Sequence, residues 1–133
     1  MRPAPLALPL VLPLLLLGLL GCPVAARSAP GDPVRGQSLY KALCTACHSV
    51  DHAGLGPPHR GVFGRLAGTA KGFGGYSSAL KRSGLVWDEA SLERWLTDPE
   101  GLVPGQAMGV SVPDAADRAD LIAYLRTLTP AKE

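Results

Sequence analysis

Apolar residues return at helical spacing in two segments of the chain, one near residue 40 and one near the C-terminus. The first stripe consists of Gly36, Leu39, Tyr40 and Leu43. These positions fall at i, i+3, i+4 and i+7, which places them on one face of a helix. Asp32 and Pro33 precede the stripe and indicate a helix start, because Asp caps free N–H groups and Pro has none to lose. The pattern therefore predicts a helix beginning at Pro33.

The second stripe lies on the longest predicted helix, which we expect to open at Pro113 and to run to about Thr127. Its members are Leu121, Tyr124, Leu125 and Leu128. Asp114 and Asp117 fall in its first turn, where the positive end of the helix dipole favours acidic side chains. Gly36 in the first stripe predicts a close crossing of the two helices, against Leu121 and Tyr124.

Two shorter helices are predicted between these two. Residues 77–83 have the pattern of a short helix ended by Gly84. Asp88 caps a helix over roughly 89–97, which the Asp98–Pro99 pair closes.

Two segments without periodicity, 49–75 and 101–113, are rich in Gly and Pro and are predicted to be irregular loops. The sequence thus predicts a single all-α domain over residues 32–128, followed by a tail at 129–133. Residues 27–133 contain 14 Gly and 8 Pro, so such a domain has a thin core. Small scaffolds of this kind usually need a disulfide, a metal or a cofactor to be stable.

The first 26 residues have the layout of a secretory signal peptide. Arg2 is followed by an apolar run over residues 6–20 and by the small residues Val24-Ala25-Ala26, which predict cleavage before Arg27. The apolar run is shorter than the ~20 residues of a membrane span and contains two prolines. Residues 1–26 are therefore interpreted as a signal peptide, with residues 27–31 as a short lead-in to the domain.

Cys22 allows a second interpretation of the leader. Leu19-Leu20-Gly21-Cys22 resembles a bacterial lipobox, in which processing before Cys22 leaves that residue lipidated at the mature N-terminus. Either route exports the domain, and we expect a periplasmic protein that is soluble or tethered by the lipid.

Cys44, Cys47 and His48 form a C-x-x-C-H motif, the attachment sequence for c-type haem. Two thiols three residues apart on one turn can both form thioethers with the vinyl groups at one edge of the porphyrin. The next residue, His48, can then bind the iron. A redox disulfide would suit C-x-x-C, but no βαβ pattern surrounds it. A zinc site could use these three residues with His52, although adjacent Cys47 and His48 reach tetrahedral positions with difficulty.

Met108 is the candidate for the sixth ligand of the iron. It is the only Met after the leader, and it lies in a turn-rich loop that starts at Pro104. His52 and His59 are close in sequence to the proximal side and are interpreted as ordinary loop histidines. Ligation by His and Met raises the reduction potential and closes both axial positions, so such an iron transfers electrons and does little else.

The net charge is only +2, from 13 Lys and Arg against 11 Asp and Glu. A nucleic-acid-binding domain would show a clear basic excess, so this function class is disfavoured.

From about Gly31 to Leu128 the sequence resembles the class I cytochromes c. Besides the C-x-x-C-H motif, the resemblance rests on Gly54–Pro57, Gly61–Arg65, Gly84–Trp87, Pro104–Met108 and Arg118–Leu125. It implies an all-α fold wrapped around one haem c, held covalently by two thioethers. The function implied is one-electron transport, without enzymatic activity, by a monomer that meets a donor complex and a terminal acceptor.

The resemblance also implies roles for individual residues. The Pro57 carbonyl would accept the N–H of His48, which fixes the tautomer of that ligand. Tyr76 and Trp87 would donate to a buried haem propionate, and Arg65 would compensate its charge. Trp95 stands where a Tyr usually donates toward the Met sulfur, and whether the indole replaces that bond is open.

Other positions depart from the family. Pro58 and His59 replace the Asn and Leu that usually follow the Gly-Pro pair, and Glu100 and Gly101 stand where lysines commonly surround the haem edge. The segment after Met108 also lacks the Phe that usually covers the ring. We therefore expect weaker electrostatic steering toward an acidic partner than in lysine-rich relatives.

Two alternative functions remain open from the sequence. A labile Met108 would leave the iron open to peroxide or a gas, as in a peroxidase or a sensor. The domain could also be a haem subunit that stays docked in a larger oxidoreductase.

Overall fold

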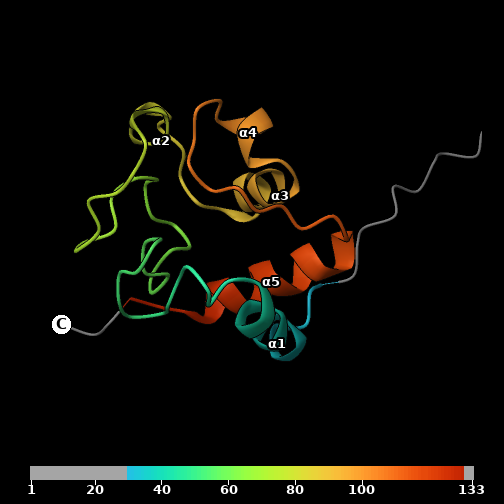
Figure 1. Ribbon diagram of the computed structural model, residues 1–133. Helices are drawn as coiled ribbons and strands as arrows, with labels where there is room; N and C mark the ends of the chain where they lie inside the picture. The colour runs from blue at the N-terminus through green and yellow to red at the C-terminus, as the bar shows by residue number, and fades with distance from the viewer. Residues whose placement is uncertain (1–29, 131–133) are drawn as a thin grey trace, which may run out of the picture.

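Helices α1 and α5 cross near the two ends of the described chain (Figure 1). The computed structural model describes residues 30–130, so the predicted leader at 1–26 lies outside the described residues. The helices are α1 (Pro33–Leu43), α2 (Ser78–Arg82), α3 (Glu89–Thr97), α4 (Pro99–Leu102) and α5 (Ala115–Thr127). Between residues 30 and 130 there is no strand, and the all-α prediction is confirmed. No helix in this range is long and apolar enough to span a bilayer.

Gly36 allows the close crossing of α1 and α5. A Cβ atom at this position would collide with the backbone carbonyl of Asp120 and lie 2.9 Å from Cβ of Tyr124. The predicted crossing is confirmed, with Asp120 rather than Leu121 at the closest approach.

Polar groups fix the same crossing at the start of α1. The backbone N–H of Asp32 donates to Oδ1 of Asp120 over 2.6 Å, and Arg35 pairs with both Asp117 and Asp120. The hydrogen bond from Asp32 and the pairing with Arg35 hold the pKa of Asp120 below its usual value. The carboxylate therefore stays ionised in the fold at neutral pH, where it links the two helices.

Two predicted boundaries were wrong, both at Asp-containing caps. The loop expected at 101–113 starts later, because Asp98 ends α3 and also caps the short helix α4 by accepting from the N–H of Gly101 at 2.9 Å. The last helix begins at Ala115 rather than at Pro113, because Asp114 is its N-cap and accepts from the N–H of Asp117. In both cases the cap rather than the proline sets the first helical turn.

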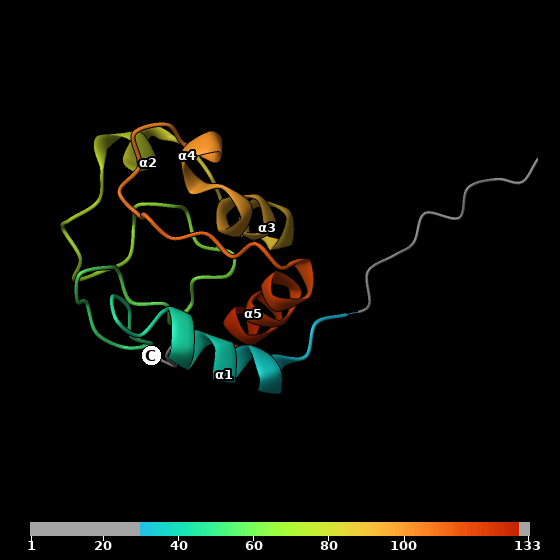
Figure 2. The same ribbon diagram turned by 45° about the vertical axis from the view of Figure 1, so that its right-hand side comes forward.

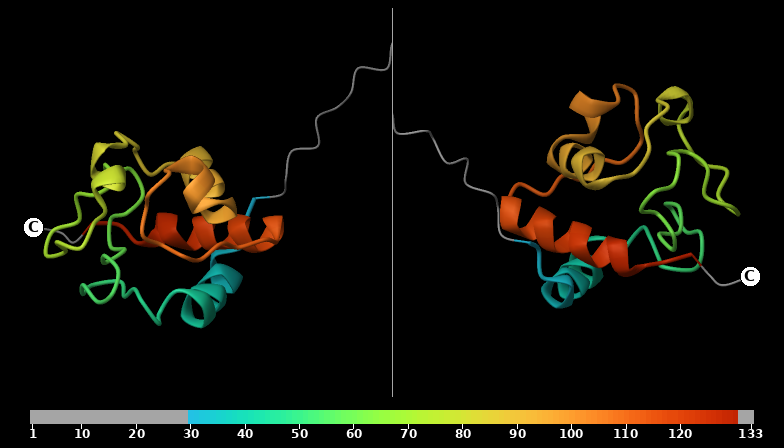
Figure 3. Two further views of the ribbon diagram at one scale, coloured as in Figure 1. Left: turned by 45° about the horizontal axis from the view of Figure 1, so that its top comes forward. Right: turned by 180° about the vertical axis from the view of Figure 1, so that it is seen from behind.

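Helix α5 lies between α1 and α3, which both pack against it (Figures 1 and 3). The segment between α1 and α2 runs on the other side of the molecule (Figure 2, green). An isolated antiparallel bridge between Leu66 and Val86 ties this segment to the start of α3. The buried apolar residues are Tyr40, Val62, Ala67, Leu80, Trp87, Leu92, Trp95, Val103, Val112, Leu121, Ile122, Leu125 and Leu128. They come from both sides and form one cluster, and eight of the thirteen also line a central cavity.

Replacing Gly36 by Ala should destabilise the protein. In an isolated helix this change is favourable by about 1 kcal/mol. Here the new methyl group collides with the Asp120 carbonyl, so we expect a net loss of about 1–3 kcal/mol in the free energy of unfolding. Denaturant titration of the folded protein measures it. Gly74→Ala is the control, because a Cβ there has no neighbour within 4 Å; equal stability of the two variants would contradict the crossing.

Candidate functional site

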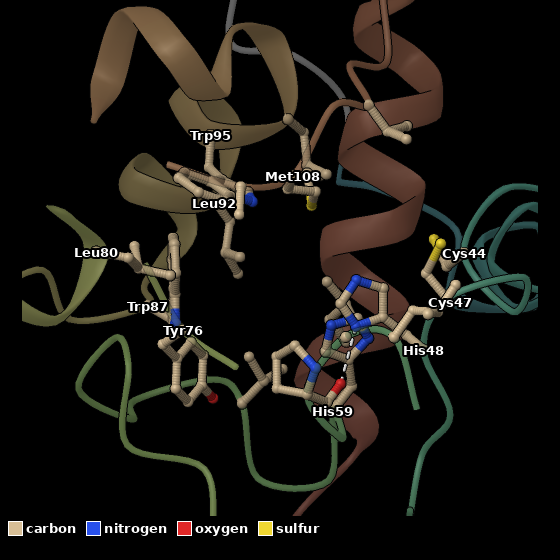
Figure 4. A pocket seen from close by; sticks show the side chains of 18 of the residues that line it. Cys44, Cys47, His48, His59, Tyr76, Leu80, Trp87, Leu92, Trp95 and Met108 are labelled. Carbon is tan, nitrogen blue, oxygen red and sulfur yellow. Dashed lines mark hydrogen bonds between the residues drawn. The ribbon is translucent and has the colours of Figure 1, made fainter. Parts of the chain in front are cut away.

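A cavity of about 280 Å³ lies between the helices and the 44–77 segment (Figure 4). Its wall is mainly apolar, with a few polar side chains at separate points. The lining residues labelled in Figure 4 are Cys44, Cys47, His48, His59, Tyr76, Leu80, Trp87, Leu92, Trp95 and Met108. A mainly apolar pocket with a few placed polar groups is typical of a cofactor site.

Cys44, Cys47 and His48 are held on the turn that ends α1. The N–H of His48 donates to the carbonyl of Cys44 over 2.9 Å, and the N–H of Cys47 donates to the same carbonyl over 3.1 Å. Both thiols are free, and both residues line the cavity. Burial, with a smaller effect from Cys47, raises the pKa of the Cys44 thiol to about 11. The structure thus presents two unpaired thiols at one edge of the cavity.

The ring of His48 is fixed by the 56–57 backbone. Nδ1 lies 2.8 Å from the carbonyl oxygen of Pro57, and since a carbonyl only accepts, Nδ1 carries the proton and donates. Gly56 packs against the same ring, where an added Cβ would lie 2.6 Å from Nδ1. This tautomer leaves Nε2 with a free lone pair that can bind a metal.

His59 is part of this site and was missed in the sequence, where it was interpreted as an ordinary loop residue. Its ring stacks on that of His48 with centroids 4.2 Å apart and planes at 22°. Its Nδ1 lies 3.1 Å from the hydroxyl of Tyr40. Burial, and to a lesser degree His48 and Arg65, lowers the pKa of His59 to about 3, so its ring is neutral at physiological pH. The only sequence signal was its position two residues after Pro57.

Met108 faces the cavity from the wall opposite His48 (Figure 4). Its loop is held by Gln106, whose side-chain oxygen accepts from the N–H of Met108. Glu100 in turn accepts from the N–H of Gly105 at 2.8 Å and from the Gln106 amide at 3.4 Å. Hydrogen bonds accepted by Glu100 of α4 therefore position the loop that carries the Met108 thioether.

Three hydrogen-bond donors line another part of the wall. The hydroxyl of Tyr76 accepts from the N–H of Ala70 at 3.1 Å, which leaves its own proton free to donate. The indole of Trp87 lines the same cavity as Tyr76 (Figure 4). Arg65 donates to two backbone carbonyls and pairs with no carboxylate between residues 30 and 130. A half-buried cation beside two free donors is a site for an anionic group.

Trp95, the last of the predicted site residues, is 7% exposed and packs edge-to-face on Trp87, with centroids 5.2 Å apart. It lies near Met108 on the same wall (Figure 4). The structure therefore brings all nine predicted residues to one cavity, with the Pro57 carbonyl acting through His48.

The family model for cytochrome c matches residues 33–129. The chain belongs to the cytochrome c family. This cytochrome is 45% identical over 107 residues to cytochrome c2 of Rhodomicrobium vannielii, with 77% of this chain and 84% of the relative covered. It is 40% identical over 110 residues to cytochrome c of Chlamydomonas reinhardtii, with coverage of 78% and 96%. Among solved structures, cytochrome cH from Methylobacterium extorquens matches with a TM-score of 0.69 and 43% identity, over 73% of this chain and 99% of the other.

Family membership establishes a c-type cytochrome that carries electrons, with covalently bound haem c as its cofactor. When bound, haem c supplies an iron that takes up and releases one electron. The cavity of this cytochrome fits the group. It offers two free thiols, a histidine nitrogen opposite a thioether, apolar walls, and an arginine without an acidic partner in the described range.

Replacing Tyr40 by Phe should destabilise this cytochrome through His59. The ring nitrogen of His59 then loses its partner while staying partly buried, and we expect a loss of about 1–3 kcal/mol in the free energy of unfolding. Denaturant titration measures it. Tyr124→Phe is the matched control, because its ring packs 5.2 Å from that of Tyr40 but its hydroxyl makes no hydrogen bond within residues 30–130. Equal losses in both variants would show that the bond to His59 contributes nothing.

Proposed function

We propose that His48 and Met108 are the two axial ligands of the haem iron, and that Cys44 and Cys47 form its two thioether bonds. The observation that carries this proposal is the placement of the His48 ring and the Met108 thioether on opposite walls of one cavity, with both thiols at its edge. With both axial positions taken by the chain, no site remains on the iron for a substrate. The protein is then a one-electron carrier and not an enzyme.

The remaining predicted residues hold this arrangement. Pro57 keeps the proton of His48 on Nδ1, so that Nε2 is the ligand atom. Arg65, Tyr76 and Trp87 bind a propionate of the haem, which supplies the acidic partner that Arg65 needs. Trp95 packs beside Trp87 and Met108 and closes the wall on the methionine side.

The proposed location of the protein is outside the cytoplasm. The leader directs export and is removed, either as residues 1–26 by cleavage before Arg27 or as residues 1–21 by cleavage before a lipidated Cys22. In the periplasm the monomeric carrier takes electrons from a donor complex and gives them to a terminal acceptor. Membership of the cytochrome c family supports redox partners in general, and the leader motif supports the location.

Replacing Met108 by Ala should leave one coordination position of the haem iron without a ligand from the chain. We expect the weak far-red band of the ferric protein to disappear and the reduction potential to fall, because the thioether stabilises the ferrous form. The ferrous variant should bind CO rapidly, whereas the wild type should bind it slowly. Absorption spectra and potentiometry give all three results.

Ser111→Ala is the control for this experiment, because it changes an exposed residue of the same loop. It should keep the band and the potential. If the Met108 variant also keeps both, another residue is the sixth ligand. If the wild type binds CO as fast as the variant, Met108 is labile and the sensor or peroxidase function is favoured.

Intact mass spectrometry of the protein from its native envelope tests the processing. Cleavage before Arg27 gives a chain of residues 27–133 plus one haem. Lipid processing gives a chain that starts at Cys22 with added acyl mass. Recovery of the chain with residues 1–21 still attached would contradict both routes.

A further inference from the structure

The cavity reaches the surface along a set of uncharged residues, which we call the rim. The rim consists of Leu43, Cys47, Leu55, Ala107, Gly109 and Val110, all exposed and all lining the cavity. Leu55 is 83% exposed, and Leu43 and Val110 are 45% and 46% exposed. The N–H of Gly56 donates to the carbonyl of Cys47 over 2.8 Å and so holds Leu55 beside the thiol turn. Large apolar side chains at the mouth of a redox site are a candidate contact surface.

Charged residues near the rim either bind other groups of the protein or lie on a different face of their helix. Asp51 pairs with Arg60, and Glu100 is held by the N–H of Gly105 and by Gln106. Lys41 is two positions before Leu43 on α1, and residues two apart on a helix do not share a face. The rim therefore has apolar side chains at its mouth and no charge of either sign among its members.

We propose that the rim fits a partner protein whose own redox site is surrounded by uncharged, apolar surface. This inference rests on the proposed function, because it assumes that electrons pass at the mouth of the cavity. The partner's chemistry follows from charge complementarity. A partner with acidic or basic groups around its site would lose their hydration on docking and find no counter-charge on the rim.

An apolar partner meets no such penalty and gains from covering Leu43, Leu55 and Val110. Three side chains of this size make a small contact, which suits a carrier that must also be released. Because no charge on the rim steers the encounter, its rate should depend little on salt. The two proteins then meet by diffusion alone, and contact between their apolar surfaces holds the complex together.

Electrodes coated with defined monolayers provide probes for this surface. The mature haem-loaded protein is adsorbed on methyl-, carboxylate- and amine-terminated monolayers, and cyclic voltammetry measures the electroactive coverage at low and high salt. We expect coverage mainly on the methyl surface and no loss of it at high salt. Leu55→Lys should lower this coverage about tenfold, as loss of one large apolar contact implies. Leu55→Ser should lower it too, without adding a charge.

Val34→Lys is the matched control, because Val34 is 74% exposed but does not line the cavity. It should leave the coverage unchanged. The proposal would be overturned if coverage were greater on a charged monolayer and were lost at high salt. It would also be overturned if the Leu55 and Val34 variants changed the coverage equally. Sedimentation should show a monomer; a dimer that Leu55→Lys dissociates would assign the rim to a second copy and overturn it as well.

Redox titration in solution separates this proposal from the proposed function. Every variant should show the same reversible one-electron couple, because none of the replaced residues holds the iron. If the wild type lacks that couple, the proposed function itself fails. If the couple is present without a preference for the methyl surface, only the docking proposal fails.

Discussion

The fold depends on apolar contact across a cavity that its own side chains do not fill. Trp87, Trp95 and Leu92 on one side and Leu121 and Leu125 on the other all line that space. Protein interiors are stable at close packing, and a wall without atoms opposite it loses dispersion contacts. A group of matching shape must therefore complete the core. Two thiols at the cavity edge allow that group to be bound covalently, so that it remains part of the fold.

Side-chain and backbone contacts hold the histidine side of the cavity in place. His48 is held by a hydrogen bond to Pro57, by contact with Gly56 and by the stacked ring of His59. His59 is in turn held by Tyr40, which belongs to α1 and contacts the ring of Tyr124 on α5. The crossing of the terminal helices and the orientation of the ligand are thus connected through contacts between side chains. A change at this crossing should reach His48 through one intervening ring.

Local signals made much of this structure predictable from the sequence. Asp caps and apolar stripes predicted the main helices, and the spacing of Cys44, Cys47 and His48 predicted the cofactor. The start of α5 was misplaced and helix α4 was missed, because proline was given more weight than the adjacent cap. His59 was missed for a different reason. Its burial depends on Tyr40 and His48 in space, and a residue in an aperiodic loop carries no pattern that reports such contacts.

The methionine side shows how charge is distributed around the site. Glu100 and Gln106 direct their polar groups at the backbone of the Met108 loop, and Arg65 lines the cavity while its guanidinium donates to two backbone carbonyls. The charges near the mouth are therefore used to hold the ligand loop and to receive the cofactor. What they leave at the surface is the uncharged rim.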